Sequence, residues 1–243
     1  NYINTLAHQL KDDVFEHKNY IGGRYSVLSE VGMLPAELMG LNEKKFKQLN
    51  YLIKNKIFIN NLISNVKSTI GLIKKKKFNS IILNYDENSD NFFRWYQQLI
   101  AESLGKKSKG IVPLISTMPK DNHSLLQLYL DGPRVNFFTF FNVKNDKTEK
   151  VSNKISQRSK MYLKNKNLSQ IIDAQRIATE RIFLIKKLPF RSFTVLKRSE
   201  ESIGELFCFF VLETILLGKV LEINPFDQPS VELIKVETKK ILT

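Results

Sequence analysis

Short apolar runs, separated by longer helical patterns, set the organisation of this chain. Each run is compact and is bounded by polar, glycine or proline positions, which is typical of a buried strand. The runs lie at 80–85, 111–116, 135–143 and 192–196. Pro113 in the second run indicates an edge position or an irregularity, because proline donates no hydrogen bond to a neighbouring strand.

Between these runs the apolar positions recur with the period of an α-helix. Asp90 is a suitable N-cap for a helix that ends near Gly105, a plausible C-cap residue. The apolar face of this helix includes Phe92, Tyr96, Leu99 and Ile100. Further helices are predicted at 123–130, 168–186, 200–217 and 229–242, the last with proline in its first turn.

The first part of the chain is predicted to be helical, with one clear break. Residues 1–21 predict a short helix and a turn, and Gly22 and Gly23 then interrupt the chain. Two glycines allow unusual backbone angles and close approach to a ligand. A helix follows from Tyr25, and Pro35 either kinks it or starts the next one. A long helical region then extends from about residue 42 to about residue 68.

Strands that alternate with helices predict an α/β domain, a three-layer α/β/α sandwich with a mostly parallel sheet. Residues 144–165 are polar, basic and poorly periodic, which predicts a loop with some helix. In open parallel sheets, ligands bind beyond the carboxyl ends of the strands. The loops after the four predicted strands are therefore the first places to look for a site.

Composition narrows the function classes further. The formal net charge of +14 suits a nucleic-acid binder, but the lysines are spread along the chain and no nucleic-acid-binding motif accompanies them. We therefore expect neither a nucleic-acid partner nor, from the interrupted apolar runs, a membrane span. The single cysteine, Cys208, predicts a buried thiol in a reducing compartment, hence the cytoplasm. Three separated histidines and one cysteine argue against a metal site.

Glu102 is the first candidate for chemistry. It lies in the last turn of its predicted helix, where the negative end of the helix dipole disfavours a carboxylate and so favours proton exchange. Gln98 is four residues earlier, so both side chains share one helix face. The alternative is a surface glutamate in a polar helix end.

Other candidates follow turns and helix starts. His123 opens a helix after a strand, where it could exchange protons with a sugar oxygen, or serve as a helix cap or core contact. Arg24, beside Gly23, could stabilise an anion or form a structural salt bridge. Gln228 and Lys235 are seven residues apart and project from one face of the last helix, although a lysine there is most often solvated.

Four motifs in order resemble the glucose-6-phosphate isomerase family. They are GGRYSVLSEVGMLP at 22–35, AESLGK at 101–106, DNHSLLQLYLDGP at 121–133 and NPFDQPSVELIK at 224–235. Two departures are the residues just before His123, where the family often has Gly-Thr and Asp-Gln, and Ser230, which replaces a frequent glycine. The resemblance implies that 24–243 is the C-terminal sugar-isomerase (SIS-type) domain. Residues 1–23 would be the tail of an N-terminal sugar-isomerase domain that the chain lacks.

The resemblance also implies the reaction and the role of each residue. Glucose 6-phosphate and fructose 6-phosphate would interconvert in glycolysis and gluconeogenesis, with Glu102 carrying a proton between C1 and C2 through a cis-enediol. Arg24 would stabilise that intermediate, and His123, donated by the partner of a homodimer, would open the sugar ring. Lys235 would assist ring opening and bind the substrate. Gln98, Gln228 and the backbone at Gly23 would bind sugar or phosphate oxygens, and no cofactor or metal is required.

Two alternatives stay open at this point. A relative of broader specificity would also accept mannose 6-phosphate. A sugar-phosphate-binding module without catalysis would need the phosphate site but not the base, so the presence of Glu102, His123, Arg24 and Lys235 argues against it.

Overall fold

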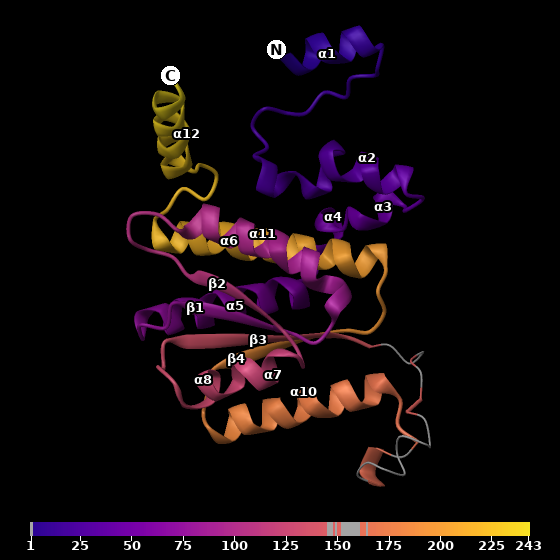
Figure 1. Cartoon of the computed structure of the whole chain (residues 1–243), viewed down its shortest axis with the longest axis vertical. Helices are drawn as coiled ribbons and strands as arrows, with labels where there is room; N and C mark the ends of the chain where they lie inside the picture. The colour runs from indigo at the N-terminus through magenta and orange to yellow at the C-terminus, as the bar shows by residue number, and fades with distance from the viewer. Residues whose placement is uncertain (1, 145–147, 149, 152–160, 164) are drawn as a thin grey trace.

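A computed structural model describes residues 2–144, 148, 150–151, 161–163 and 165–243 of the chain (Figure 1). At its centre lies a sheet of four strands in the order β2-β1-β3-β4. The strands are β1 (Asn79–Asn84), β2 (Val112–Thr117), β3 (Asn136–Val143) and β4 (Phe190–Val195). Every adjacent pair is parallel, so the predicted strands and their parallel arrangement are confirmed. Pro113 lies in β2, which is an edge strand as its sequence indicated.

Helices cover both faces of this sheet, which confirms the predicted three-layer α/β/α sandwich (Figure 1). One face packs against α5 (Lys56–Lys74), α6 (Asp90–Leu104) and α11 (Glu200–Leu221). The opposite face packs against α8 (Leu126–Asp131) and α10 (Leu168–Ile185). Alternate residues of β1 point to opposite faces, so Ile82 belongs to the first core and Ile81 to the second.

Helix α6 positions part of the candidate site, and local sequence signals set its ends. Ser89 occupies the N-cap position, so the prediction that Asp90 caps the helix is wrong by one residue. Asp90 is the first helical residue, and its Oδ1 accepts a hydrogen bond from Asn84 Nδ2 at 2.6 Å, so it is engaged elsewhere. Gly105 is the C-cap, as predicted.

The N-terminal part is more broken than the pattern indicated. Helix α1 (Tyr2–Leu10) is followed by η1 (Gly23–Leu28) and α2 (Glu30–Leu38), which contains Pro35 in its interior. The long helical region predicted from about 42 to 68 consists of three separate helices: α3 (Glu43–Phe46), α4 (Leu49–Leu52) and α5. The physical reason is capping, because the Asn55 side chain accepts hydrogen bonds from Ile57 N and Phe58 N and starts a new helix there.

The remaining elements follow the predictions closely. The helix predicted at 123–130 is split into α7 (Asp121–Ser124) and α8, and η2 (Glu87–Ser89) precedes α6. Helix α11 extends to Leu221, and α12 (Pro229–Leu242) begins with proline as predicted. The loop predicted at 144–165 lies mostly outside the described residues, which include η3 (Met161–Leu163). Cys208 is 2% exposed, and burial raises the pKa of its thiol to about 11.

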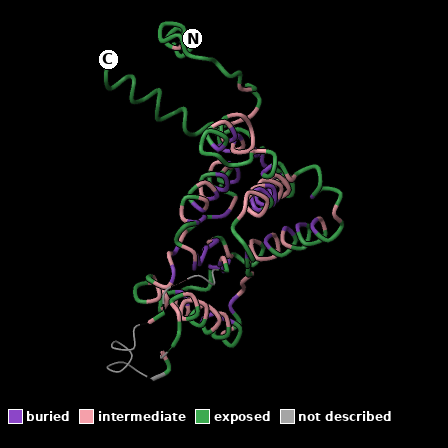
Figure 2. Tube along the Cα trace, turned by 90° about the vertical axis from the view of Figure 1, so that its right-hand side faces the viewer, coloured by how far each residue is buried: buried purple, intermediate pink, exposed green. Residues whose placement is uncertain are grey.

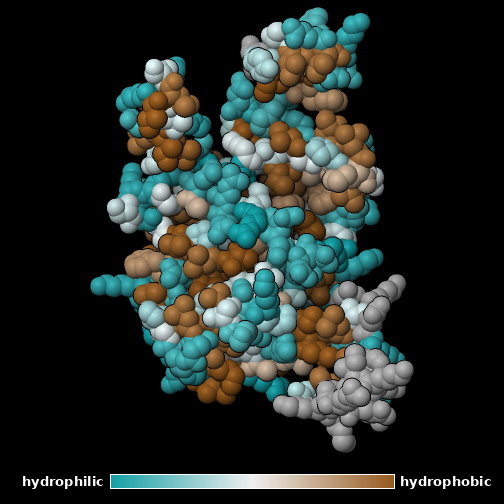
Figure 3. All heavy atoms as spheres, in the orientation of Figure 1, coloured by the Kyte–Doolittle hydropathy of each residue, from teal (hydrophilic) through white to brown (hydrophobic). Residues whose placement is uncertain are grey.

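Both ends of the described chain project from the body of the domain (Figures 1 and 2). Neither α1 nor α12 contains a buried residue. Both helices nevertheless carry large apolar side chains, and in Figure 3 these form hydrophobic patches on the two projecting ends. Such exposed apolar helix faces mark surfaces that bind another partner or segment.

Candidate active site

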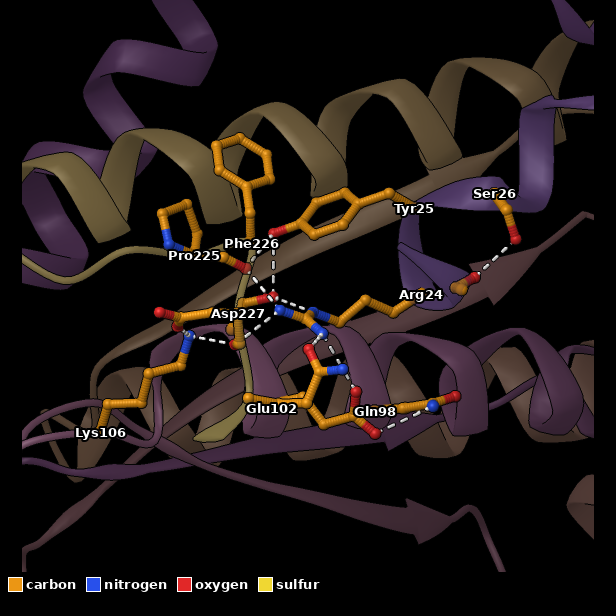
Figure 4. A network of polar contacts seen from close by, with 12 residues as sticks. Arg24, Tyr25, Ser26, Gln98, Glu102, Lys106, Pro225, Phe226 and Asp227 are labelled. Carbon is orange, nitrogen blue, oxygen red and sulfur yellow. Dashed lines mark hydrogen bonds and ion pairs between the residues drawn. The ribbon is translucent and has the colours of Figure 1, made fainter. Parts of the chain in front are cut away.

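The candidate residues converge from three segments that are far apart in the sequence (Figure 4). Helix η1 supplies Arg24, and the last two turns of α6 supply Gln98 and Glu102. The segment between α11 and α12 supplies Gln228, the N-cap residue of α12. Because α6 and α11 run antiparallel to the strands, their C-terminal ends bring this cluster to the amino edge of the sheet (Figure 1).

Arg24 is the centre of this cluster. Its side chain is 1% exposed, and its five N–H groups all have acceptors in the protein. Nε donates to Ser103 Oγ at 2.8 Å. Nη1 donates to Glu102 Oε2 at 3.2 Å and to Gln228 Oε1 at 2.7 Å. Nη2 donates to the carbonyl oxygens of Pro225 and Asp227 at 2.7 and 3.0 Å, so the guanidinium ties the three segments together.

Glu102 is the accessible acid of the cluster. Its side chain is 31% exposed, and its two oxygens accept from different partners: Oε2 from Arg24 and Oε1 from Gln98 Nε2 at 3.0 Å. Donors from Arg24 and Gln98 each contact a different carboxylate oxygen and so fix the orientation of the side chain. Gln98 therefore orients Glu102, a contact that the shared helix face predicted.

A layer of polar and aromatic contacts supports Arg24 from behind. The Tyr25 hydroxyl lies 2.9 Å from Ser103 Oγ and 3.0 Å from the Pro225 carbonyl oxygen, to which it donates. Burial raises the pKa of Tyr25, while its hydrogen bond to Ser103 opposes that shift. The Arg24 guanidinium also lies 5.3 Å from the centre of the Tyr25 ring, a cation–π contact. None of these supporting roles was foreseen from the sequence, although Ser103 lies inside the AESLGK motif.

Lys106 is a further residue that the sequence analysis missed. Its ammonium group forms an ion pair with Asp227, with 2.6 Å between Nζ and Oδ1. The hydrogen bond from Lys106 lowers the pKa of Asp227 and keeps this carboxylate ionised. The basic residue of AESLGK was the available signal, because it follows Glu102 by four positions.

His123 is not part of this cluster. It lies in α7, directly after the carboxyl end of β2, whereas Glu102 precedes the amino end of β2. The six residues of β2 span roughly 20 Å at about 3.3 Å per residue, so the two side chains of one chain lie at opposite edges of the sheet. The exposed His123 imidazole has no hydrogen-bond partner within the described part of the chain. The expectation that the site lies beyond the carboxyl ends of the strands is wrong for the Arg24–Glu102 cluster.

Lys235 also lies outside the cluster. Its ammonium group pairs with Glu232 at 2.7 Å, and both side chains are more than 60% exposed. Seven residues of helix place Lys235 about 10 Å along α12 from Gln228. Lys235 therefore lies on the projecting helix α12, two helical turns beyond Gln228.

The backbone angles of Gly23 are ordinary, although two consecutive glycines would have allowed unusual ones. Gly40 and Gly110 are the described glycines with positive φ, and neither Gly22 nor Gly23 is among them. A Cβ atom at Gly23 would meet no atom within 4 Å. The open space beside Gly23 leaves room for a ligand next to Arg24, which is the remaining reason for a small residue there.

Known proteins similar to this chain agree with the four sequence motifs that resemble the glucose-6-phosphate isomerase family. The family model described as phosphoglucose isomerase matches residues 9–243. The chain belongs to the phosphoglucose isomerase family. It is 33% identical over 234 residues to a probable glucose-6-phosphate isomerase of Methanococcus maripaludis, covering 94% of this chain and 53% of the relative. It is 34% identical over 229 residues to the glucose-6-phosphate isomerase of Mycoplasmopsis pulmonis, with 91% and 54% covered. The chain thus spans about half the length of these family members.

Two solved structures have a fold similar to that of this chain. A hypothetical protein from Thermus thermophilus superposes with a TM-score of 0.87 at 25% identity, covering 99% of this chain and 60% of that one. A glucose-6-phosphate isomerase from Chlamydia trachomatis superposes with a TM-score of 0.73 at 18% identity, covering 94% and 48%. This second similarity concerns the fold alone.

No group of three or more His, Cys, Asp or Glu side chains in the described ranges is placed to hold a metal ion. Among the helices of the same residues, none is long and apolar enough to cross a membrane.

Proposed function

We propose that this chain is the C-terminal part of an isomerase that interconverts glucose 6-phosphate and fructose 6-phosphate. Membership of the phosphoglucose isomerase family and its similarity to glucose-6-phosphate isomerases support this activity. The observation that carries the proposal is the convergence of Arg24, Gln98, Glu102 and Gln228 at the end of α6. Arg24, Glu102 and Gln228 come from three of the four motifs on which the resemblance rests, and Gln98 lies one helical turn before Glu102.

Glu102 is proposed as the base that moves the proton between C1 and C2 of the sugar. Its partial exposure gives a substrate access, and its hydrogen bonds to Arg24 and Gln98 hold the carboxylate in one orientation. A cis-enediol intermediate would develop negative charge on oxygen, and Arg24 is the nearby positive charge that would stabilise it. Gln228 is then placed to bind a sugar or phosphate oxygen.

Arg24 can reach a substrate only through Nη1. Its Nε and Nη2 hydrogens point into the protein and donate to Ser103 and to two backbone carbonyls. Nη1 faces the partly exposed Glu102 and Gln228 side chains, whose acceptors can exchange for substrate oxygens. A substrate oxygen would therefore displace Glu102 or Gln228 from Nη1, and displacement of Glu102 would release the base for proton transfer.

His123 and Lys235 complete the proposed machinery. Because β2 separates His123 from Glu102 in one chain, a shared site requires a second copy of the chain. The exposed, unpartnered His123 imidazole within the described residues is compatible with donation to the partner of a homodimer, where it would open the sugar ring. Lys235 would assist ring opening and bind the substrate once α12 is docked.

We further propose that residues 24–243 form the C-terminal sugar-isomerase domain and that 1–23 lead in from an N-terminal one. The projecting helix α12 supports this arrangement, because it needs an apolar surface to bind. Its large exposed apolar side chains are Val231, Leu233, Ile234, Val236, Ile241 and Leu242 (Figure 3). Docking onto the other half would cover this face and bring Lys235 toward the site. A glycolytic enzyme of this kind acts in the cytoplasm.

The alternatives have less support. A sugar-phosphate sensor needs no base, yet Glu102 is oriented by two donors. A relative that also accepts mannose 6-phosphate would share every residue described here, so the stereochemistry accepted at C2 separates the two enzymes.

The test is the conversion of fructose 6-phosphate to glucose 6-phosphate by the full-length protein that contains this chain. Glu102→Gln keeps the size of the side chain and one of its two acceptor oxygens but cannot act as a base. We expect turnover to fall by about 10³-fold or more, with sugar-phosphate binding largely retained. Glu37→Gln, at an exposed position of α2, is the matched control and should keep wild-type turnover. Equal loss of binding and turnover in Glu102→Gln would contradict its role as the base.

A further inference from the structure

Lys106 holds the segment that carries Gln228. Its Nζ donates to the carbonyl oxygens of Asn224 and Asp227 and to Oδ1 of Asp227. An ammonium group has three hydrogens, so these three acceptors use all of its donors. The side chain is only 11% exposed, which leaves it no free face for a substrate. Lys106 therefore acts on the protein itself (Figure 4).

The segment that Lys106 holds is the one that holds Arg24. The Asp227 carbonyl oxygen accepts from both Lys106 Nζ and Arg24 Nη2, and the nearby Pro225 carbonyl oxygen accepts from Arg24 Nη2 and from the Tyr25 hydroxyl. Gln228, the next residue, accepts from Arg24 Nη1. A shift of this segment would consequently move three of the five acceptors of the Arg24 guanidinium.

The turn between residues 224 and 227 is itself short and closed. Asn224 Oδ1 accepts from Phe226 N at 3.1 Å, and Asn224 Nδ2 donates to Asp227 Oδ2 at 3.0 Å. The turn can therefore move as one unit. Lys106 is its attachment to the end of α6, only four residues beyond Glu102.

We propose that Lys106 is a positioning residue of the isomerase site. It attaches the 224–227 turn to the end of α6, so that Arg24 and Gln228 are held at fixed distances from Glu102. The inference rests on the proposed function, because positioning has a kinetic meaning only if Glu102, Arg24 and Gln228 perform the isomerisation. A displacement of about 1 Å in catalytic groups is enough to reduce turnover up to 10²-fold.

A nearby lysine provides a matched control. Lys109 also donates from Nζ to a backbone carbonyl, that of Leu221, at 2.9 Å. It likewise connects the loop after α6 to the chain end of α11, but it does not contact residues 224–228. Removing the Lys109 ammonium group therefore removes a comparable hydrogen bond between the loop after α6 and α11, but it leaves the residues that accept from Arg24 attached.

The experiment compares Lys106→Met with Lys109→Met in the full-length protein, using fructose 6-phosphate as substrate. We expect Lys106→Met to lower kcat at least tenfold while KM changes less than threefold, and Lys109→Met to change neither by more than twofold. The reason is that misplaced Arg24 donors reduce the stabilisation of the transition state more than they reduce the binding of the substrate. Lys106→Gln serves as a second variant if Lys106→Met does not fold, as judged by circular dichroism.

A double variant separates positioning from general destabilisation. If Lys106 acts through Arg24, Lys106→Met should reduce kcat less than threefold in an Arg24→Lys background. An independent, tenfold reduction in that background would overturn the proposal, as would equal kcat values for the folded Lys106 variant and Lys109→Met. An inactive wild-type protein would instead overturn the proposed function, and with it the role of Lys106, so the two failures are distinguishable.

Discussion

The guanidinium of Arg24 contacts the carboxylate of Glu102 across 78 positions of sequence, with 3.2 Å between Nη1 and Oε2. One partner is almost fully buried and the other is partly exposed. The pair therefore forms the boundary between the protein interior and the space open to a substrate. Every donor of Arg24 is satisfied, so the geometry of this boundary is set by the folded chain before any substrate binds.

Replacing Arg24 with lysine keeps the charge but should destabilise the protein. Lysine has three donors on one atom and cannot serve the five acceptors now bound, so several buried acceptors would lose their partners. We expect a loss of about 2–4 kcal/mol in the free energy of unfolding, measured by urea denaturation. Arg94→Lys, at an exposed position of α6, should change it by less than about 0.5 kcal/mol. An unchanged urea midpoint for Arg24→Lys would contradict the central role given to its hydrogen bonds.

Mixing two inactive variants tests whether His123 acts in the partner's site. In a heterodimer of Glu102→Gln with His123→Ala, one site combines both defects and the other combines both intact residues. Random assembly of equal amounts should recover about a quarter of wild-type activity, because half of the dimers are mixed and each has one intact site. Activity is measured after unfolding and refolding the mixture. No recovery in a confirmed heterodimer would indicate that His123 acts within its own chain.

Gly204 should not tolerate a side chain. A Cβ atom there would lie 2.2 Å from the carbonyl oxygen of Phe46 and 2.7 Å from its Cα, so backbone must move where α11 packs on α3. We expect Gly204→Ala to destabilise the fold by about 1–3 kcal/mol. Gly71→Ala in α5 is the matched control, because a Cβ there meets no atom within 4 Å and alanine favours a helix by about 0.5–1 kcal/mol. Equal thermal stabilities of the two variants would refute this packing argument.

His17 forms a contact near the start of the chain whose strength should depend on pH. Its Nδ1 lies 2.7 Å from Glu30 Oε1 and its Nε2 lies 3.0 Å from the Ile21 carbonyl oxygen, so the imidazolium donates to both. The hydrogen bond to Glu30 raises the pKa of His17 above its ordinary 6.5. The pKa of Glu30 is lowered from 4.5, first by its own backbone N–H and then by His17.

The signs of these shifts define where the contact stabilises the fold. The contribution of His17 is complete below pH 6.5 and is lost as pH rises through its raised pKa. The contribution of Glu30 is present above pH 4.5 and is lost as pH falls through its lowered pKa. We expect NMR titration to show a lower His17 pKa in Glu30→Gln than in wild type or Glu37→Gln. Identical titrations would refute the contact.

Much of the fold was predictable because its signals are local. The strands were placed within one or two residues, since compact apolar runs and their flanking turns depend only on neighbouring positions. The errors were also local. The capping side chain of Asn55 was present in the sequence, yet no helix boundary was predicted there within the helical region from about 42 to 68.

The sequence by itself determined which residues are available for chemistry, because the four motifs carry them in a fixed order. It also predicted that Gln98 and Glu102 share a helix face, which requires only the period of a helix. Only the tertiary structure decided three further points. All N–H donors of Arg24 have acceptors in the protein, Lys106 attaches the 224–227 turn to the end of α6, and β2 separates His123 from Glu102. The physical reason is chain topology: contacts between positions far apart in sequence depend on how the strands and helices pack, which no local pattern specifies.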